Sequence, residues 1–168
     1  MLVARFWAAK VNPRDGQKYY ESFVLANLRD RALRTGIHPV LVKVTYNYWR
    51  GPRIVRIGQH HSPRIFYAAC GLPAGDISND AFVKAYAIFA FDAFVSRNPN
   101  VRLSSYVGDD VVNSVGDADA VRKDLKAAAK DLREVFRDEL EVDLAIKKLA
   151  TVASTAHLAA HLHTDLGS

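Results

Sequence analysis

The chain has 168 residues, of which 49% are hydrophobic and 24% are charged, and its formal net charge is +5. This length and composition are typical of one folded domain and argue against a disordered chain. Charged residues interrupt every apolar stretch well short of 18 residues, and the first residues lack the pattern of a secretory signal. We therefore expect no transmembrane helix and no membrane partner.

A single cysteine, Cys70, excludes an internal disulfide and favours a reducing, intracellular compartment, either cytoplasmic or nuclear. Its neighbours in the sequence are apolar. They predict a packed thiol rather than a nucleophile.

The positive charge is concentrated in one segment. Eight Lys or Arg residues lie between Arg29 and Arg64 against one acid, whereas eleven acids and six bases lie between Asp109 and Asp143. A basic segment with interleaved aromatic residues is typical of a surface that binds nucleic acid, and it is equally compatible with a solvated basic face. The arginines that we expect to hold a nucleic-acid backbone are Arg50, Arg53, Arg56 and Arg64.

The first half of the chain predicts a strand, two helices and a hairpin. Residues 2–11 are β-prone, residues 20–34 have apolar positions at helical spacing, and residues 40–49 follow Pro39 as a second helix. We expect the second helix to turn Val40, Leu41, Val44 and Tyr48 inward.

Residues 53–58 and 64–68 then form a hairpin around a polar loop that contains His60 and His61. Adjacent histidines in a strand or loop diverge, which disfavours a metal site there. A glycine-opened turn at residues 71–76 leads into a largely buried helix over residues 78–96.

The second half predicts a hairpin, a long helix and an edge strand. Residues 101–106 and 111–114 are short β-prone runs, and the tip between them carries Asp109 and Asp110. Asp117 is the expected N-cap of a helix that ends near residue 140. Its apolar stripe consists of Val121, Leu125, Ala128, Leu132, Phe136 and Leu140.

Residues 142–155 contain an edge strand with Lys147 and Lys148, and residues 157–168 form a C-terminal tail with no evident partner. His157 and His161 have the i, i+4 spacing of a metal-binding pair. No third ligand accompanies them convincingly, so the sequence favours surface histidines.

This order of elements predicts an α+β fold, in which helices pack on one face of a mainly antiparallel sheet. Asp15 follows the first strand, and Asp109 and Asp110 lie in the later hairpin. If these strands are neighbours, three carboxylates converge at one end of the sheet, where they require cations. Taken alone, the Asp109-Asp110 sequence favours a solvated turn, and the elements around it must decide.

Four motifs in order resemble the palm of reverse transcriptases of the group II intron and non-LTR retroelement type. Asp15-Gly16-Gln17-Lys18-Tyr19-Tyr20 is similar to the first palm motif, Gly71-Leu72-Pro73-Ala74-Gly75 to the glycine-proline motif, and Tyr106-Val107-Gly108-Asp109-Asp110 to the "Y-x-D-D" turn. Residues 144–153 are similar to the lysine-bearing motif that follows. Ala74 stands where the family has glutamine, and the acidic turn has one extra residue.

The resemblance implies a polymerase palm-like (ferredoxin/RRM-like) fold over residues 1–156 and template-directed nucleotidyl transfer, as an RNA-directed DNA polymerase. It implies that Asp15, Asp109 and Asp110 are catalytic and bind two Mg²⁺ or Mn²⁺ ions. Its implied substrate-binding residues are Tyr19, Tyr20, Gly71, Pro73, Gly75, Lys147 and Lys148.

The implied partners are an RNA or DNA template-primer and nucleoside triphosphates. Fingers and thumb are expected to be largely absent from this stretch, so such segments of a longer polyprotein are further candidate partners. The alternative is a non-catalytic nucleic-acid-binding α+β module that retains the palm shape. A basic globular domain with chance motif matches is the third interpretation.

Overall fold

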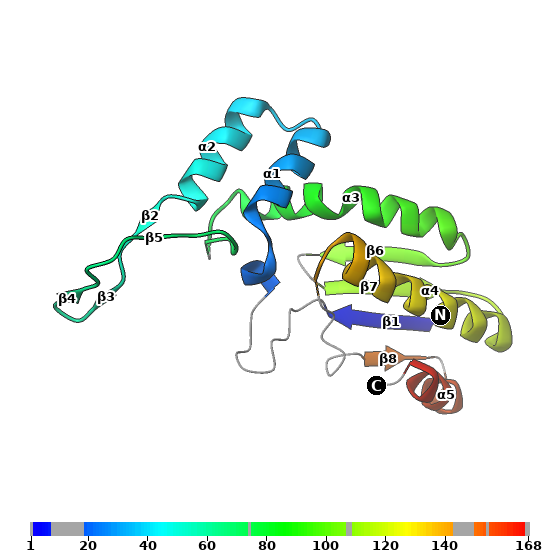
Figure 1. Ribbon diagram of the computed structural model, residues 1–168. Coiled ribbons are helices and arrows are strands. Elements are labelled where there is room, and N and C mark those ends of the chain that lie inside the picture. The colour runs from blue at the N-terminus through cyan, green and yellow to red at the C-terminus, as the bar shows by residue number, and fades with distance from the viewer. Residues whose placement is uncertain are drawn as a thin grey trace. The chain divides into compact units, whose positions relative to one another are not determined.

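The structure is a computed structural model, which describes residues 2–7, 19–73, 75–106, 109–142, 150–153 and 155–166. The chain is mixed α+β, as predicted (Figure 1). Asp15, Lys147 and Lys148 lie outside the described residues. No helix in the described ranges is both long enough and apolar enough to cross a membrane.

The elements follow one another in this order: β1 (Leu2–Trp7), the 3-10 turn η1 (Tyr19–Ser22), α1 (Leu25–Arg34), α2 (Pro39–Trp49), β2 (Pro52–Arg53), β3 (Arg56–Ile57), β4 (His60–His61), β5 (Phe66–Tyr67), α3 (Asn79–Arg97), β6 (Arg102–Tyr106), β7 (Asp109–Ser114), α4 (Ala118–Glu134), the π-helical turn η2 (Val135–Glu139), β8 (Ala150–Val152) and α5 (Ala156–Leu166).

The chain divides into two compact units. Unit 1 comprises Met1–Tyr19 and Ala87–Ser168, and unit 2 comprises Tyr20–Tyr86. Unit 2 is therefore inserted into the sequence of unit 1 between β1 and the second half of α3.

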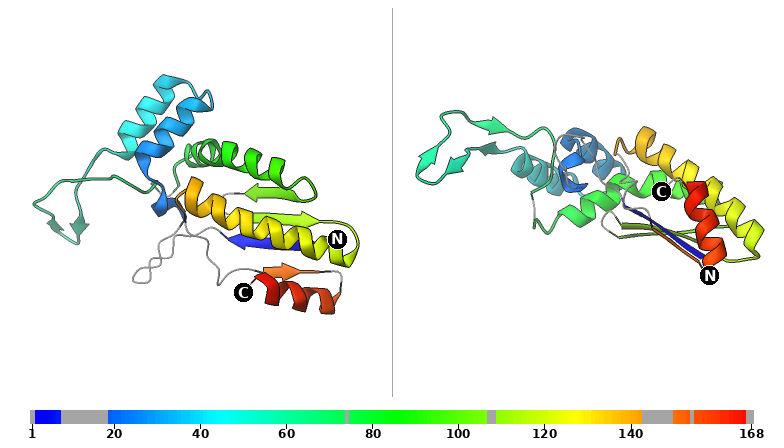
Figure 2. Two further views of the ribbon diagram at one scale, coloured as in Figure 1. Left: turned by 45° about the vertical axis from the view of Figure 1, so that its right-hand side comes forward. Right: turned by 90° about the horizontal axis from the view of Figure 1, so that it is seen from below.

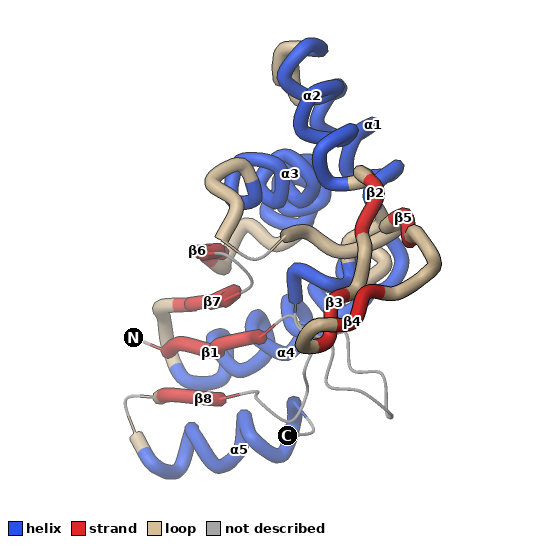
Figure 3. Tube along the Cα trace, turned by 90° about the vertical axis from the view of Figure 1, so that its left-hand side faces the viewer, coloured by secondary structure: helices blue, strands red, loops and turns tan. Residues whose placement is uncertain are grey.

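Unit 1 contains a four-stranded sheet with the strand order β6-β7-β1-β8 (Figure 3). Every neighbouring pair is antiparallel. Leaving out the inserted unit, the elements run β1, α3, β6, β7, α4, β8, which is a β-α-β-β-α-β succession. β8 lies at the edge of the sheet, as predicted from residues 142–155.

Helices cover one face of this sheet, as Figure 2 shows for α4 and α5. The predicted stripe of α4 and η2 is buried from Val121 to Leu140, because its spacing follows the helix period. Asp117 caps α4 as predicted: its Oδ1 accepts from the backbone nitrogens of Asp119 and Ala120 at 3.0 and 3.4 Å.

The C-terminal segment, for which the sequence suggested no partner, contains α5, which packs against α4 and β8. Leu162 carries this contact, since its side chain is fully buried. Among the α5 side chains that the structure describes, Leu162 is the large buried one, so this histidine-rich segment docks as a helix.

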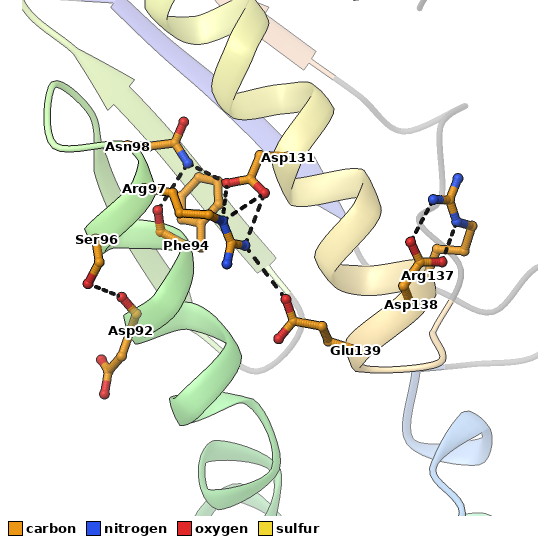
Figure 4. A network of polar contacts seen from close by, with 9 residues as sticks. All are labelled: Asp92, Phe94, Ser96, Arg97, Asn98, Asp131, Arg137, Asp138 and Glu139. Atoms are coloured by element: carbon orange, nitrogen blue, oxygen red, sulfur yellow. Dashed lines mark hydrogen bonds and ion pairs between the residues drawn. The ribbon is translucent and has the colours of Figure 1, made fainter.

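A polar network joins the end of α3 to α4 (Figure 4). Arg97 Nε donates to both carboxylate oxygens of Asp131 at 3.1 Å, and the side-chain nitrogen of Asn98 donates to the same carboxylate. Arg97 also lies 3.6 Å from Glu139. The hydrogen bond to Asp131, with the charges of Asp131 and Glu139, outweighs partial burial and raises the pKa of Arg97. The network fixes α3 against the helix that covers the sheet.

Unit 2 breaks the helix that the sequence predicts over residues 20–34. The chain forms η1, passes through Val24 in an extended conformation, and only then begins α1. The break follows from pairing with the distant Cys70: Val24 and Cys70 form an antiparallel bridge, and Gly71 N donates to Phe23 O at 2.9 Å. Tertiary pairing overrides helical periodicity here.

The predicted inward face of α2 is wrong. Val40, Leu41, Val44 and Tyr48 are exposed, whereas Val42 and Trp49 are buried. Most sides of α2 are apolar, so periodicity alone does not select a face. The selection comes from Trp49, whose ring meets Phe82 edge-on with centroids 4.8 Å apart, and Val42 lies two turns earlier on the same stripe.

Residues 52–67 form a two-stranded antiparallel ribbon that projects away from α1 and α2 (Figure 1). The predicted hairpin is confirmed in outline, but its tip lies at Gly58 with φ +61°, and His60 and His61 form β4 rather than a loop. Ser62 N donates to Val55 O at 2.8 Å between the two short ladders, which makes the ribbon continuous.

We predict that Asp131→Ala lowers the free energy of unfolding of unit 1 by about 1–2 kcal/mol, because it removes charged hydrogen bonds to Arg97 and Asn98. Urea unfolding followed by circular dichroism measures the loss. Asp138→Ala is the matched control, since Asp138 is exposed and pairs with its sequence neighbour Arg137. Equal effects of the two substitutions would contradict the role given to the network.

Candidate active site

The sequence predicted that the two adjacent aspartates lie at a hairpin tip, but in the structure they belong to a strand. They are the first two residues of β7, and Asp109 is already in register with Tyr106 of β6. The connection between the strands is therefore only residues 107–108. The predicted strand of residues 111–114 left out both aspartates because Asp has a low strand propensity. In the structure, pairing with both β6 and β1 determines their extended conformation.

Asp110 is a buried carboxylate at the end of the sheet. Its residue is 1% exposed, and it alternates with Val112 and Ser114, which are also buried. These three positions share the sheet face that α4 covers. A buried carboxylate is costly unless hydrogen bonds or a cation compensate it, which distinguishes Asp110 from an ordinary solvated turn residue.

The same end of the sheet contains the last residues of β1. Phe6 is in register with Asp110, and Trp7 with Asp109. Asp15 follows β1 in the sequence and lies outside the described residues. The side chain of Asp109 is not among those described. Among the side chains that are, no group of three or more His, Cys, Asp or Glu is arranged to hold a metal ion.

In unit 2 the structure brings Tyr20 beside the glycine-proline motif of residues 71–75. Leu72 N donates to Tyr20 O at 2.9 Å, and the Tyr20 hydroxyl donates to Asp80 Oδ1 at 3.2 Å. Gly71 and Gly75 have φ values of +87° and +80°, a conformation that other residues adopt at a cost. Two predicted substrate-binding motifs thus form one cluster. Tyr19 lies in η1, but its side chain is not described.

Asp76, which the sequence analysis passed over, organises this cluster. Trp49 Nε1 donates to Asp76 Oδ2 at 2.7 Å, and Ser78 N donates to Asp76 Oδ1 at 2.7 Å. Partial burial raises the pKa of Asp76, but the hydrogen bonds from Ser78 and Trp49 together outweigh it, so the pKa lies below its ordinary value.

Asn79 and Asp80 were also missed, although they begin α3. Asn79 is buried and its side-chain nitrogen donates to Pro73 O at 2.7 Å, which holds the motif against the helix. The available signal was the Asp-x-Ser-Asn sequence at residues 76–79, since short polar side chains before an apolar helix are typical helix-start residues.

The ribbon carries the predicted basic residues. Arg53, Arg56 and Arg64 are all exposed on it, Arg50 immediately precedes it, and residues 51–75 contain no acid. Arg53 Nη2 donates to Trp49 O at 2.8 Å, and Arg56 Nε donates to Gly58 O at 2.9 Å. Large apolar side chains are exposed beside them: Ile54, Val55, Ile57, Ile65, Phe66 and Tyr67.

Cys70 is exposed, which contradicts the packed thiol expected from its neighbours. It follows the returning strand of the ribbon, where the backbone bridge to Val24 leaves the side chain at the surface. Apolar neighbours in sequence do not predict burial in a segment that has no layer behind it.

A comparison with protein-family models finds no match, and none of the curated proteins matches the chain.

We predict that the contribution of Asp76 to stability is present above pH 3.8, its ordinary pKa, and is lost as the pH falls below it, because the folded state favours the ionised carboxylate. At pH 7, Asp76→Asn should lower the free energy of unfolding of unit 2 by about 1–2 kcal/mol. Urea unfolding monitored by Trp49 fluorescence, in a Trp7→Phe background, measures both effects.

The difference between the Asp76→Asn variant and the parent should shrink between pH 7 and pH 3. Asp30→Asn is the control, since Asp30 is an exposed residue that pairs with its neighbour Arg29. A pH-independent difference would show that Asp76 does not act through its charge.

Proposed function

We propose that the chain is a palm-like nucleotidyltransferase related to RNA-directed DNA polymerases. The observation that carries the proposal is the pairing of the start of β7 with the end of β1, which places Asp109 and Asp110 opposite Trp7 and Phe6. Asp15 follows β1 in the sequence. The β-α-β-β-α-β succession of unit 1 is that of a ferredoxin-like fold, which supports the palm-like fold implied by the resemblance.

The donor set fits Mg²⁺ or Mn²⁺, because carboxylate oxygens are the hard ligands that these ions prefer. Asp109 and Asp110, with Asp15, would hold the ions. Two bound ions supply activation of the attacking hydroxyl and stabilisation of the leaving oxygen. The protein itself holds Asp109 and Asp110 at the end of the sheet, and burial excludes water from the Asp110 carboxylate.

The cluster around Tyr20 is proposed to contact the incoming nucleotide. The resemblance assigns the aromatic pair Tyr19 and Tyr20 to screening the sugar, and Gly71, Pro73 and Gly75 to the surface under it. The hydrogen bond that the Tyr20 hydroxyl donates to Asp80 supports a fixed orientation of the phenol ring, and the bond from Leu72 N to Tyr20 O fixes the main chain. Lys147 and Lys148 are proposed to lie near the phosphates.

The ribbon is proposed to hold the nucleic-acid backbone. An isolated two-stranded hairpin is only marginally stable in water, so a ribbon with exposed apolar side chains gains stability from lying on a surface. All cations from residue 50 to residue 70 that carry a permanent charge are arginines, whose planar guanidinium groups bind phosphate oxygens in pairs. Because residues 51–75 contain no acid, no carboxylate of this segment repels a nucleic-acid backbone.

We predict that Asp109→Asn reduces primer extension by at least about a hundredfold, because it removes one charged metal ligand. Extension is measured with Mg²⁺ or Mn²⁺ on RNA and DNA templates, and nucleic-acid affinity should remain unchanged. Asp110→Asn should reduce extension likewise, since Asp110 is the second proposed metal ligand of β7.

Asp92→Asn, an exposed residue of α3, is the control and should leave extension unchanged. Extension that survives Asp109→Asn would overturn the catalytic assignment. Nucleic-acid binding without extension on any template, even with a fingers segment restored, would favour the alternative of a non-catalytic nucleic-acid-binding module.

We predict that Arg56→Gln with Arg64→Gln weakens binding to duplex DNA and lowers the slope of log K against log salt by about 0.9 for each arginine that contacts a phosphate. Fluorescence anisotropy between 50 and about 200 mM salt measures the slope. Lys123→Gln, an exposed cation of α4, is the matched control. An unchanged slope would exclude the ribbon as the phosphate contact.

A further inference from the structure

Two histidines of α5 face each other across one helical turn. His157 Nε2 and His161 Nε2 lie 3.1 Å apart, and both residues are exposed. Their rings are edge-to-face, with centroids 4.3 Å apart and an interplanar angle of 69°. The nitrogens are therefore closer together than the ring centres, which means that the two nitrogen-bearing edges converge.

This separation matches the bite of a chelated ion. If each Nε2 is placed about 2.05 Å from a common metal, the 3.1 Å separation gives an N–metal–N angle of about 98°. That angle lies between the octahedral and the tetrahedral values, so the separation of the two nitrogens suits either coordination geometry. Without a metal, the two nitrogens share one proton as donor and acceptor.

We propose that His157 and His161 form a chelating site for a transition-metal ion of the Zn²⁺, Ni²⁺ or Cu²⁺ class. Imidazole nitrogen suits these ions, whereas Mg²⁺ and Ca²⁺ prefer oxygen ligands. Water completes the coordination shell, because both side chains are exposed. The site is separate in its elements and its ligand chemistry from the carboxylates of β7, and it does not depend on the proposed polymerase activity.

Metal binding at this position acts on the docking of α5. An ion bound at i and i+4 closes one helical turn, and the neighbouring residue Leu162 is the fully buried side chain that anchors α5 in unit 1. A ligand that binds the folded helix and not the unfolded segment stabilises the fold by mass action. The ion would thus hold the last helix on the sheet layer.

The test is a calorimetric titration of the full chain with Zn²⁺ alone as the probe, in excess Mg²⁺ to occupy the carboxylates. We expect one equivalent of Zn²⁺ to bind, and His157→Ala or His161→Ala to weaken binding at least about tenfold, since two linked ligands act together. Zn²⁺ should raise the thermal midpoint of the parent and not that of either variant.

Two controls separate chelation from a mere count of histidines. His61→Ala removes an exposed imidazole of β4 and should leave Zn²⁺ affinity unchanged. His157→Ala combined with Ala156→His keeps the number of histidines but changes the spacing to five residues, and it should weaken binding as much as His157→Ala alone. Equal Zn²⁺ affinity in the parent and in the spacing variant, or displacement of Zn²⁺ by Mg²⁺, would overturn the site. Neither outcome would bear on primer extension.

Discussion

The pairing of β7 between β6 and β1 is the constraint on which unit 1 depends. A slip of one residue in this register would turn Asp110, Val112 and Ser114 from the helix-covered face to the open face. Val112 is fully buried and α4 packs on β7, so the hydrophobic contact of the helix layer fixes the register. The position of the acidic pair at the sheet end is thus a consequence of core packing some residues further along the same strand.

Unit 2 depends on a different interaction, the hydrogen bonds of the Asp76 carboxylate next to a group of packed aromatic side chains. The Asp76 carboxylate accepts hydrogen bonds from Trp49 Nε1 and from Ser78 N, just before α3. Phe23 and Tyr86 pack edge-to-face, with ring centroids 5.1 Å apart. Backbone hydrogen bonds from Leu72 to Tyr20 and from Gly71 to Phe23 join the glycine-proline motif to the segment before α1. Each unit therefore has its own means of presenting the residues that the resemblance singles out: strand register in unit 1, and the hydrogen bonds of Asp76 and Asn79 near the start of α3 in unit 2.

Elements with a strong local signal could be predicted from the sequence, namely α4 with its Asp117 cap, α3, the β6–β7 pairing and the edge strand β8. The errors share a physical cause, which is that distant partners decided the outcome. Val24 is extended rather than helical because it pairs with Cys70. The buried face of α2 is the one that carries Trp49, because Trp49 packs against Phe82. Asp109 is extended because it pairs with β1. Of the candidate site, the aspartates and the Tyr20 region were named from motifs, whereas the hydrogen bonds of Asp76 with Trp49 and of Asp80 with Tyr20 are visible only in the tertiary structure.

The insertion of unit 2 has a consequence for the order in which the protein folds. All residues of unit 2 are contiguous, so its contacts close early and locally as the chain leaves the ribosome. β1 precedes unit 2 in the chain, whereas its partners β7 and β8 lie more than 100 residues later, so its pairing must close a long loop. From this topology we expect the sheet of unit 1 to be completed after the contacts within unit 2, because its closure carries the larger loop-entropy cost.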